Sequence, residues 1–291
     1  MAMEYWILFA FASALFAGLT SILAKIGLKG VDSDLATALR TIVVLGFAWA
    51  VVLIVGSQGS IGEISAYTLA FLVLSGLATG ASWLCYFRAV QIGQVSKVSP
   101  IDKSSTVLTM VLAFIFLGEG LSLWTVAGMA LMIAGTFLMV QRAGEDEEPK
   151  TDRRSWIMFA CLAAFFAALT SILGKVGIEG VESNLGTAIR TLVVLLMAWM
   201  IVLARKKHRD VRGIGRRNWR FIILSGFATG LSWLCFYNAL QSGPASVVVP
   251  IDKLSIVVTV VLAFLILRER VSKRAVLGLV LLTIGTLALL L

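Results

Sequence analysis

Residues 74–85 read LSGLATGASWLC, and residues 224–235 repeat them almost unchanged as LSGFATGLSWLC. Residues 100–103, PIDK, return in the same way at 250–253. Both pairs are 150 residues apart, and sliding the chain by that distance superposes its two halves without a gap. Self-similarity at a fixed offset is the mark of a repeat architecture. The chain is therefore a tandem duplication.

The composition places both halves in a membrane. Of the 291 residues, 59% are hydrophobic and only 14% are charged, whereas soluble domains carry about 25% charged residues. Four prolines and three cysteines exclude a collagen-like repeat and a disulfide-stabilised scaffold. The cysteines and the single histidine, His208, lack metal-ligand spacing, so no metal site, no cofactor and no enzymatic activity is expected. The net charge of +9 is interpreted as a topology signal, not as a nucleic-acid site.

Ten segments have the roughly 20 mostly apolar residues that a membrane-spanning helix needs. They lie approximately at residues 6–28, 35–55, 69–92, 95–117, 123–140, 156–178, 185–204, 221–240, 245–267 and 275–291. The expected fold class is an all-α integral membrane protein with ten transmembrane helices in two five-helix repeats, residues 1–141 and 155–291, joined by a charged linker at 142–154. Because five is odd, the second repeat must enter the membrane from the opposite side, which gives an inverted-topology repeat.

Lysine and arginine in the loops predict the orientation, because they concentrate on the cytoplasmic side of membrane proteins. The linker and the loop at 205–220 are rich in both and fall on one side of the predicted bundle, whereas the loops around Gln58 and Gly118 have neither. The linker and the basic loop are therefore expected in the cytoplasm and both termini outside, in a multi-pass protein of the inner cell membrane. A site for anionic lipid or for a protein partner is the alternative interpretation of the basic loop.

Ionisable residues inside the predicted spans are candidate functional groups, because a charge at a helix centre costs roughly 2.5–3.5 kcal/mol. The candidates for substrate binding or coupling are Lys25, Arg40, Asp102, Lys103, Lys175, Arg190, Asp252 and Lys253. A cation near a helix start opposes the helix dipole and needs a partner, so an ion pair between Arg40 and Asp102 is expected. Snorkelling lysines and a dipole-stabilised aspartate are the alternative interpretation.

These groups are expected to form two equivalent polar clusters on opposite sides of the membrane midplane, as gates or half-sites. Each cluster holds three cations and one aspartate, which suits an anionic or zwitterionic substrate. Pro100 and Pro250 lie inside the fourth helix of each repeat and are expected to kink it, because proline displaces the carbonyl four residues before it. Trp83 and Trp233 lie in mid-helix, and both cavity lining and packing remain open for them.

Small residues predict close contacts between helices. Such residues form a ridge in the third helix, at Ser75-Gly76 and Thr79-Gly80, and recur in the fifth helices as Gly128, Gly135, Gly278 and Gly285. Packing is the expected role of both groups. Glu119 and Glu269, after the fourth helices, are expected to be solvent-exposed turn residues.

The pattern resembles the drug/metabolite transporter superfamily, specifically its EamA type. The resemblance rests on Lys25 and Lys175 in the first helices, on Arg40 and Arg190 in the second helices, and on the closing signature of each repeat. That signature comprises Gly118-Glu119, Gly128 and Gly135, and then Arg268-Glu269-Arg270, Gly278 and Gly285. The resemblance implies a ten-helix bundle whose central cavity exports or exchanges a small metabolite, often coupled to protons or a counter-substrate. It also implies cytoplasmic termini, whereas the loop charges favour the reverse.

The expected function is secondary transport of a small polar metabolite, anionic or zwitterionic, by alternating access, as an exporter or an exchanger. Asp102 and Asp252 would be protonated or pair with the arginines, the lysines would neutralise substrate anions or close gates, and Trp83 and Trp233 would shape the cavity. A lipid-carrier flippase served by the basic loop and a non-transporting membrane scaffold are the alternatives. The expected partners are the substrate and the bilayer, not nucleic acid. Proton or counter-substrate coupling and a homo-oligomer are left open.

Overall fold

The computed structural model describes residues 2–117, 122–140, 150–243, 245–269 and 271–288. All regular secondary structure in these residues is helical. Some predictions fall outside them, namely most of the linker at 142–154 and the signature residues Gly118, Glu119 and Arg270.

The helices follow the same order in both repeats. The first repeat contains α1 (Ala2–Gly27), α2 (Ser33–Val55), the 3-10 segment η1 (Ser57–Glu63), α3 (Ala66–Ile92), α4 (Val95–Lys103), α5 (Ser105–Leu117) and α6 (Leu123–Val140). The second contains α7 (Lys150–Ile178), α8 (Ser183–Ala204), the 3-10 segment η2 (Lys207–Gly213), α9 (Arg216–Ser242), α10 (Ala245–Lys253), α11 (Ser255–Leu262), the π turn η3 (Ala263–Leu267) and α12 (Lys273–Ala288). This is the duplication that the sequence predicts.

Eight of the described helical stretches are long and apolar enough to cross a membrane. α4 and α5 together form one of them, Lys97–Phe116, and α10, α11 and η3 form another, Val248–Leu267. α6 is shorter, and α12 has 16 residues and begins with two basic side chains. The all-helical membrane class is confirmed, but the count of ten spans is not, because the fifth helix of each repeat is shorter than the others.

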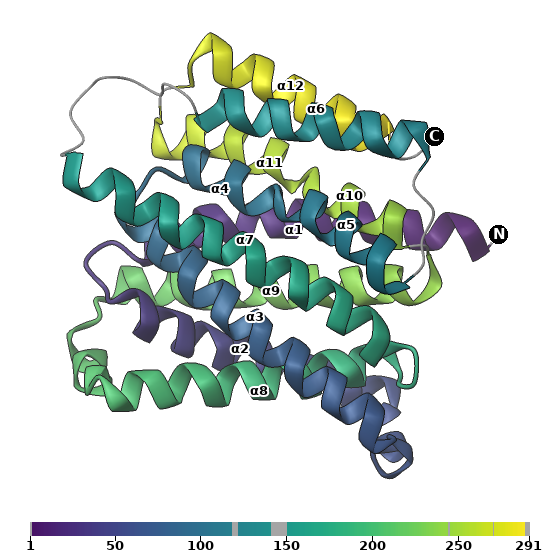
Figure 1. Ribbon diagram of the computed structural model, residues 1–291. Helices are drawn as coiled ribbons and strands as arrows, with labels where there is room; N and C mark the ends of the chain where they lie inside the picture. The colour runs from purple at the N-terminus through teal and green to yellow at the C-terminus, as the bar shows by residue number, and fades with distance from the viewer. Residues whose placement is uncertain (1, 118–121, 141–149, 244, 270, 289–291) are drawn as a thin grey trace.

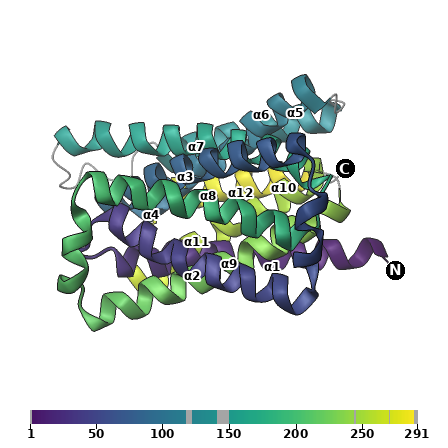
Figure 2. The same ribbon diagram turned by 90° about the horizontal axis from the view of Figure 1, so that it is seen from below.

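The two repeats are interlocked. α1 lies along α9 and α7 along α3, so the first helix of each repeat packs on the third helix of the other (Figures 1 and 2). α2 likewise contacts α8, and α6 contacts α12. In Figure 1, α1 begins at the right-hand end of the bundle and α7 at the left-hand end, so these two helices run in opposite directions. This is the inverted arrangement expected of repeats with an odd number of spans.

Glycines allow a close helix contact between α6 and α12. A Cβ atom on Gly135 would lie 2.5 Å from the carbonyl oxygen of Gly278, and one on Gly285 would lie 2.8 Å from that of Gly128. A larger residue at these crossings would have to move the backbone of the neighbouring helix. Gly76, in the ridge of α3, packs similarly close to α8. The prediction that these small residues are packing sites is confirmed.

Acidic side chains cap several helix starts. Asp32 accepts hydrogen bonds from the backbone amides two and three residues later, at 3.0 and 3.2 Å, and Glu182 caps α8 in the same way, at 3.0 Å each. Burial raises the pKa of Glu182, but the hydrogen bonds outweigh it and hold the pKa below its ordinary value. Glu269 accepts a hydrogen bond from the amide of Val95 at 3.2 Å. The prediction that Glu269 is only an exposed turn residue is therefore wrong, because it reaches the start of α4.

The basic segment between α8 and α9 docks on the start of α2. Arg205 forms an ion pair with Asp34, and the Nζ atom of Lys207 lies 3.8 Å from the carboxylate of Asp32. The mirror positions of these two basic residues in the first repeat are uncharged. Part of the basic loop therefore connects the two repeats at one end of the bundle.

Candidate functional site

A break in the fourth span of each repeat positions the charged Asp-Lys pairs. Ser104 separates α4 from α5, and Leu254 separates α10 from α11, each directly after the Pro-Ile-Asp-Lys motif. The amide of Ser104 is shared between the carbonyls of Pro100, at 3.0 Å, and Ile101, at 3.1 Å. The interruption thus lies four residues after the proline, whereas the sequence predicts a disturbance four residues before it. Such backbone irregularity is tolerated in a membrane only where it lines a cavity or is buried in protein.

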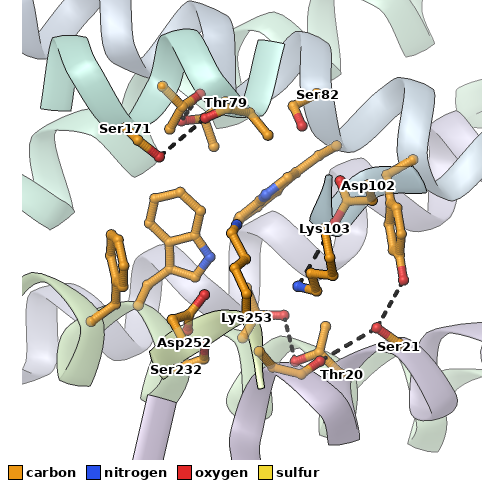
Figure 3. Close-up of a pocket in the computed structure, with 18 of the residues that line it drawn as sticks. Thr20, Ser21, Thr79, Ser82, Asp102, Lys103, Ser171, Ser232, Asp252 and Lys253 are labelled. Carbon is orange, nitrogen blue, oxygen red and sulfur yellow. Dashed lines mark hydrogen bonds and ion pairs between the residues drawn. The ribbon is translucent and has the colours of Figure 1, made fainter. Parts of the chain in front are cut away.

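One cavity lies where the two repeats meet (Figure 3). Its volume is about 140 Å³, which at roughly 10–15 Å³ per water molecule is room for on the order of ten waters. Its lining is nearly two-fold symmetric, because most lining residues come in pairs 150 positions apart. The pairs are Ala17 with Ala167, Thr20 with Thr170, Ser21 with Ser171, Thr79 with Thr229, Ser82 with Ser232, Trp83 with Trp233, Tyr86 with Phe236, Phe87 with Tyr237, Asp102 with Asp252 and Lys103 with Lys253.

A single charged site takes the place of the two separate clusters predicted from the sequence. Asp102, Lys103, Asp252 and Lys253 all line the same cavity, and Figure 3 shows the two lysines between the two aspartates. The interlocked packing is the reason, because α4 contacts α11 and α10 contacts α5. The two broken spans therefore bring their charged pairs together at the junction of the repeats.

The two Asp-Lys pairs have different partners. The Nζ atom of Lys103 lies 3.7 Å from the carboxylate of Asp102. Asp252 instead accepts a hydrogen bond of 2.6 Å from the hydroxyl of Ser13, whose mirror position is an alanine. Among the described residues, Lys253 makes no hydrogen bond and no ion pair. Its charge therefore faces the cavity without a bonded partner.

Each buried arginine donates a hydrogen bond to the other repeat. Arg40 Nη1 donates to Thr229 at 3.0 Å, and Arg190 Nη2 donates to Thr79 at 2.9 Å. The two arginines are 3% and 2% exposed. Within the described part of the chain neither has an ion-pair partner, and Arg40 Nη2 and two nitrogens of Arg190 have no hydrogen-bond partner. The expected ion pair between Arg40 and Asp102 is therefore not formed, because Arg40 turns to the threonine and to aromatic rings.

Aromatic rings cover both guanidinium groups. Arg40 lies 3.8 Å from the ring centre of Phe87 and 4.9 Å from that of Trp83. Arg190 has the mirror arrangement, at 4.3 Å from the ring centre of Tyr237 and 5.0 Å from that of Trp233. A cation over an aromatic face is attracted by the ring quadrupole. Trp83 and Trp233 also touch edge to face, with ring centres 5.5 Å apart, and both line the cavity. Cavity lining and packing therefore both apply to the two tryptophans.

Three of the candidate residues lie outside the cavity lining. Arg190 does not line the cavity, although its counterpart Arg40 does. Lys25 donates to the carbonyls of Val90, at 2.6 Å, and Gly93, at 2.7 Å, where α3 ends. A cation there satisfies open carbonyls and complements the helix dipole. Lys175 holds the mirror position near the end of α7 and is also absent from the lining.

Several hydroxyl groups of the cavity were missed by the sequence analysis. The hydroxyl of Tyr86 donates to Ser21 at 2.8 Å. Thr20 and Ser21 recur in the second repeat as 170–171, and this recurrence of two polar residues within an apolar helix was the signal available. Ser13 has no counterpart in the second repeat, so no internal comparison could single it out.

Comparisons with known proteins agree with this architecture. The EamA-like transporter family matches the chain twice, at residues 4–141 and 154–291. A relative from Sinorhizobium sp, an uncharacterized transporter in the cobO 3' region, is 45% identical over 136 residues, which cover 47% of this chain and 96% of the relative. That relative is thus about as long as one repeat. The uncharacterized transporter YxxF of Bacillus subtilis (strain 168) is 26% identical over 174 residues, 58% of this chain and 54% of the relative.

A solved crystal structure shares the fold. It superposes with a TM-score of 0.75 over 98% of this chain and 96% of its own length, at 18% sequence identity. At that identity the likeness shows the fold alone. The double match of the family, which covers nearly the whole chain, carries the assignment. This chain belongs to the EamA-like transporter family.

Proposed function

We propose that the protein is a secondary transporter that moves a small polar metabolite, anionic or zwitterionic, by alternating access, as an exporter or an exchanger. The observation that carries the proposal is the cavity lined by mirror-related residues of two inverted repeats. Alternating access needs one site that each side of the membrane reaches in turn. Two inverted repeats supply such a site, because exchanging their conformations turns the opening from one side to the other.

The contents of the cavity support a polar substrate. Five charged side chains line it, and charges inside a membrane are expensive unless they serve a site or a pathway. Asp102, Asp252, Lys103, Lys253 and Arg40 are the proposed binding or coupling groups. The volume of about 140 Å³ supports a small metabolite. Coupling to protons or to a counter-substrate belongs to the same proposal.

The proposed orientation places the linker and the basic loop in the cytoplasm of a cell with the protein in its inner membrane. Figure 1 supports a common side for them, since η2 lies at the same end of the bundle as the start of α7, opposite the N-terminal end of α1. In this proposal α6 and α12 cross the membrane as a close pair, which completes ten spans in repeats 1–141 and 155–291 around the linker at 142–154.

Counterflow into proteoliposomes tests the function. Purified protein is reconstituted, loaded in turn with amino acids, organic anions, organic cations and nucleotide sugars, and assayed for uptake of the labelled compound. Ala17→Phe and Ala167→Phe would fill the cavity from mirror positions and are expected to abolish uptake. Ala50→Phe, on an exposed face of α2, is the matched control and is expected to transport normally.

Two results would contradict the proposal. Normal uptake by both folded cavity-filling variants would show that the substrate does not pass through the cavity. Absence of counterflow with every class, in protein whose fold is verified by its thermal transition, would show that the protein does not work as a secondary transporter of small metabolites.

A further inference from the structure

The charges around the cavity do not balance. Its lining holds three cationic side chains, Arg40, Lys103 and Lys253, against two carboxylates, Asp102 and Asp252. With each group in its ordinary ionised form, the lining carries a net charge of +1. Arg190 is 2% exposed, packs against aromatic rings and is not a lining residue, so this count leaves it out. An unbalanced charge in a membrane interior is costly, so the cavity favours a ligand that brings negative charge.

Two of the lining cations keep hydrogen-bond donors that have no partner among the described residues. Lys103 is paired with Asp102 at 3.7 Å, and Asp252 receives a hydrogen bond from Ser13. Lys253, by contrast, has neither a hydrogen bond nor an ion pair among the described residues. Arg40 is 3% exposed and uses Nη1 for Thr229, while its Nη2 has no partner in the part of the chain that the structure describes. The Nη2 of Arg40 is itself buried, so the ammonium group of Lys253 is the donor that an acidic group of a ligand would satisfy.

Six aromatic side chains line the cavity alongside the charged residues, eight serines and threonines and two alanines. Trp83 and Trp233 meet edge to face, and Phe236 and Tyr237 pack around Trp233, at ring-centre distances of 6.5 and 5.3 Å. Rings of this kind bind flat apolar groups through their faces and edges. With space for on the order of ten waters, the cavity accommodates about one ring and one acidic group.

We propose that the substrate of the cavity is a small organic monoanion: a single carboxylate held by Lys253, on a flat apolar body that packs against Trp83 and Trp233. The inference rests on the proposed function for its site and narrows the anionic or zwitterionic class to one net negative charge. A zwitterion leaves the excess charge of the lining in place, a cation increases it and a dianion reverses it.

A series of ligands that share one body and differ only in charge tests the proposal. Phenylacetate carries −1, phenylalanine 0, phenethylamine +1 and phenylmalonate −2 at neutral pH. The dissociation constant of each is measured by isothermal titration calorimetry with the full-length protein in detergent. Phenylacetate is expected to bind at least tenfold more tightly than the other three, because it alone neutralises the lining.

Variants of the lining shift the preference in opposite directions. Lys253→Gln makes the lining neutral, so the affinity for phenylacetate is expected to fall at least tenfold and the preference over phenylalanine to disappear. Asp102→Asn raises the net charge to +2, so phenylmalonate is expected to gain affinity relative to phenylacetate. Lys273→Gln, at the exposed start of α12, removes the same charge away from the cavity and is expected to leave all four constants unchanged.

The wild-type series decides the inference even if a variant does not fold. The inference would be overturned if phenylalanine, phenethylamine or phenylmalonate bound more tightly than phenylacetate. It would also be overturned if phenylacetate showed no binding at a concentration of about 10 mM. Counterflow of a zwitterion without binding of monoanions would sink this inference and keep the proposed function. Binding of phenylacetate without counterflow of any monoanion would support the preference of the cavity for a monoanion and contradict the proposed transport.

Discussion

The reciprocal hydrogen bonds between arginines and threonines make a sharp test of the interlocked fold. Thr229→Val removes the hydroxyl that accepts from Arg40 at 3.0 Å, and Thr79→Val removes the one that accepts from Arg190 at 2.9 Å. Valine has nearly the same shape as threonine, so the change removes the hydroxyl without opening a cavity. Each hydroxyl also donates to a carbonyl of its own helix, Thr229 to Ser225 at 2.8 Å and Thr79 to Ser75 at 2.7 Å, and these bonds are lost as well. The two variants are mirror images of each other in the structure.

The expected cost follows from the burial of the two cations. A hydrogen bond to a charged group contributes about 1.5–3 kcal/mol, and here its loss leaves a guanidinium that is at most 3% exposed with aromatic contacts only. At about 2–4 °C per kcal/mol for a chain of this size class, each variant is expected to lower the melting temperature by about 3–12 °C. Because the sites are mirror related, the two shifts are expected to agree closely. Scanning fluorimetry of the purified protein in detergent measures them.

Thr136→Val is the matched control. The hydroxyl of Thr136 in α6 is buried, and within the described residues it has no hydrogen-bond partner. Its removal is therefore expected to leave the melting temperature unchanged or to raise it, since a buried polar group without a partner is unfavourable. Equal destabilisation by all three variants, or none by the two cavity variants, would refute the assignment of the arginine bonds.

Three further predictions concern other parts of the molecule. Gly278→Leu is expected to lower the melting temperature strongly, because even its Cβ would meet the carbonyl oxygen of Gly135 at 2.6 Å. Gly46→Leu, where a Cβ meets nothing within 4 Å, is the control and is expected to be tolerated. Equal melting curves for the two variants would contradict the α6–α12 contact. Separate chains 1–141 and 154–291 are expected to co-purify when expressed together, with a tag on one of them, because α1 packs on α9 and α7 on α3; recovery of the tagged half alone would contradict the interlocked fold. The stabilising contribution of Glu182 is expected to be full above its ordinary pKa of 4.5 and to be lost as the pH falls through its lowered value. The difference in melting temperature between wild type and Glu182→Gln should therefore shrink on acidification, and a difference that stays constant down to the loss of folding would contradict the cap.

Local features of the fold could be predicted from the sequence. The apolar segments, the fifth-helix glycines and the charged pairs in mid-span were predicted because each depends on composition and spacing within a single helix. The residues that contact the charged side chains could not be predicted in this way. Arg40 was assigned to Asp102 by charge alone. In the structure it bonds to Thr229, which the interlocked second repeat supplies, and packs on the rings of Phe87 and Trp83 in its own repeat.

The sequence by itself determined the duplication, the membrane class and the inverted relation of the two repeats, because self-similarity and hydropathy are properties of the chain read in order. Only the tertiary structure decided that the two Asp-Lys pairs, expected in separate clusters, line one cavity. That outcome depends on contacts between residues far apart in the chain, such as Ser13 and Asp252, which are separated by 239 positions and bonded at 2.6 Å. No periodicity within a helix specifies which helix of the other repeat it will pack against, and the chemistry of the cavity follows from that choice.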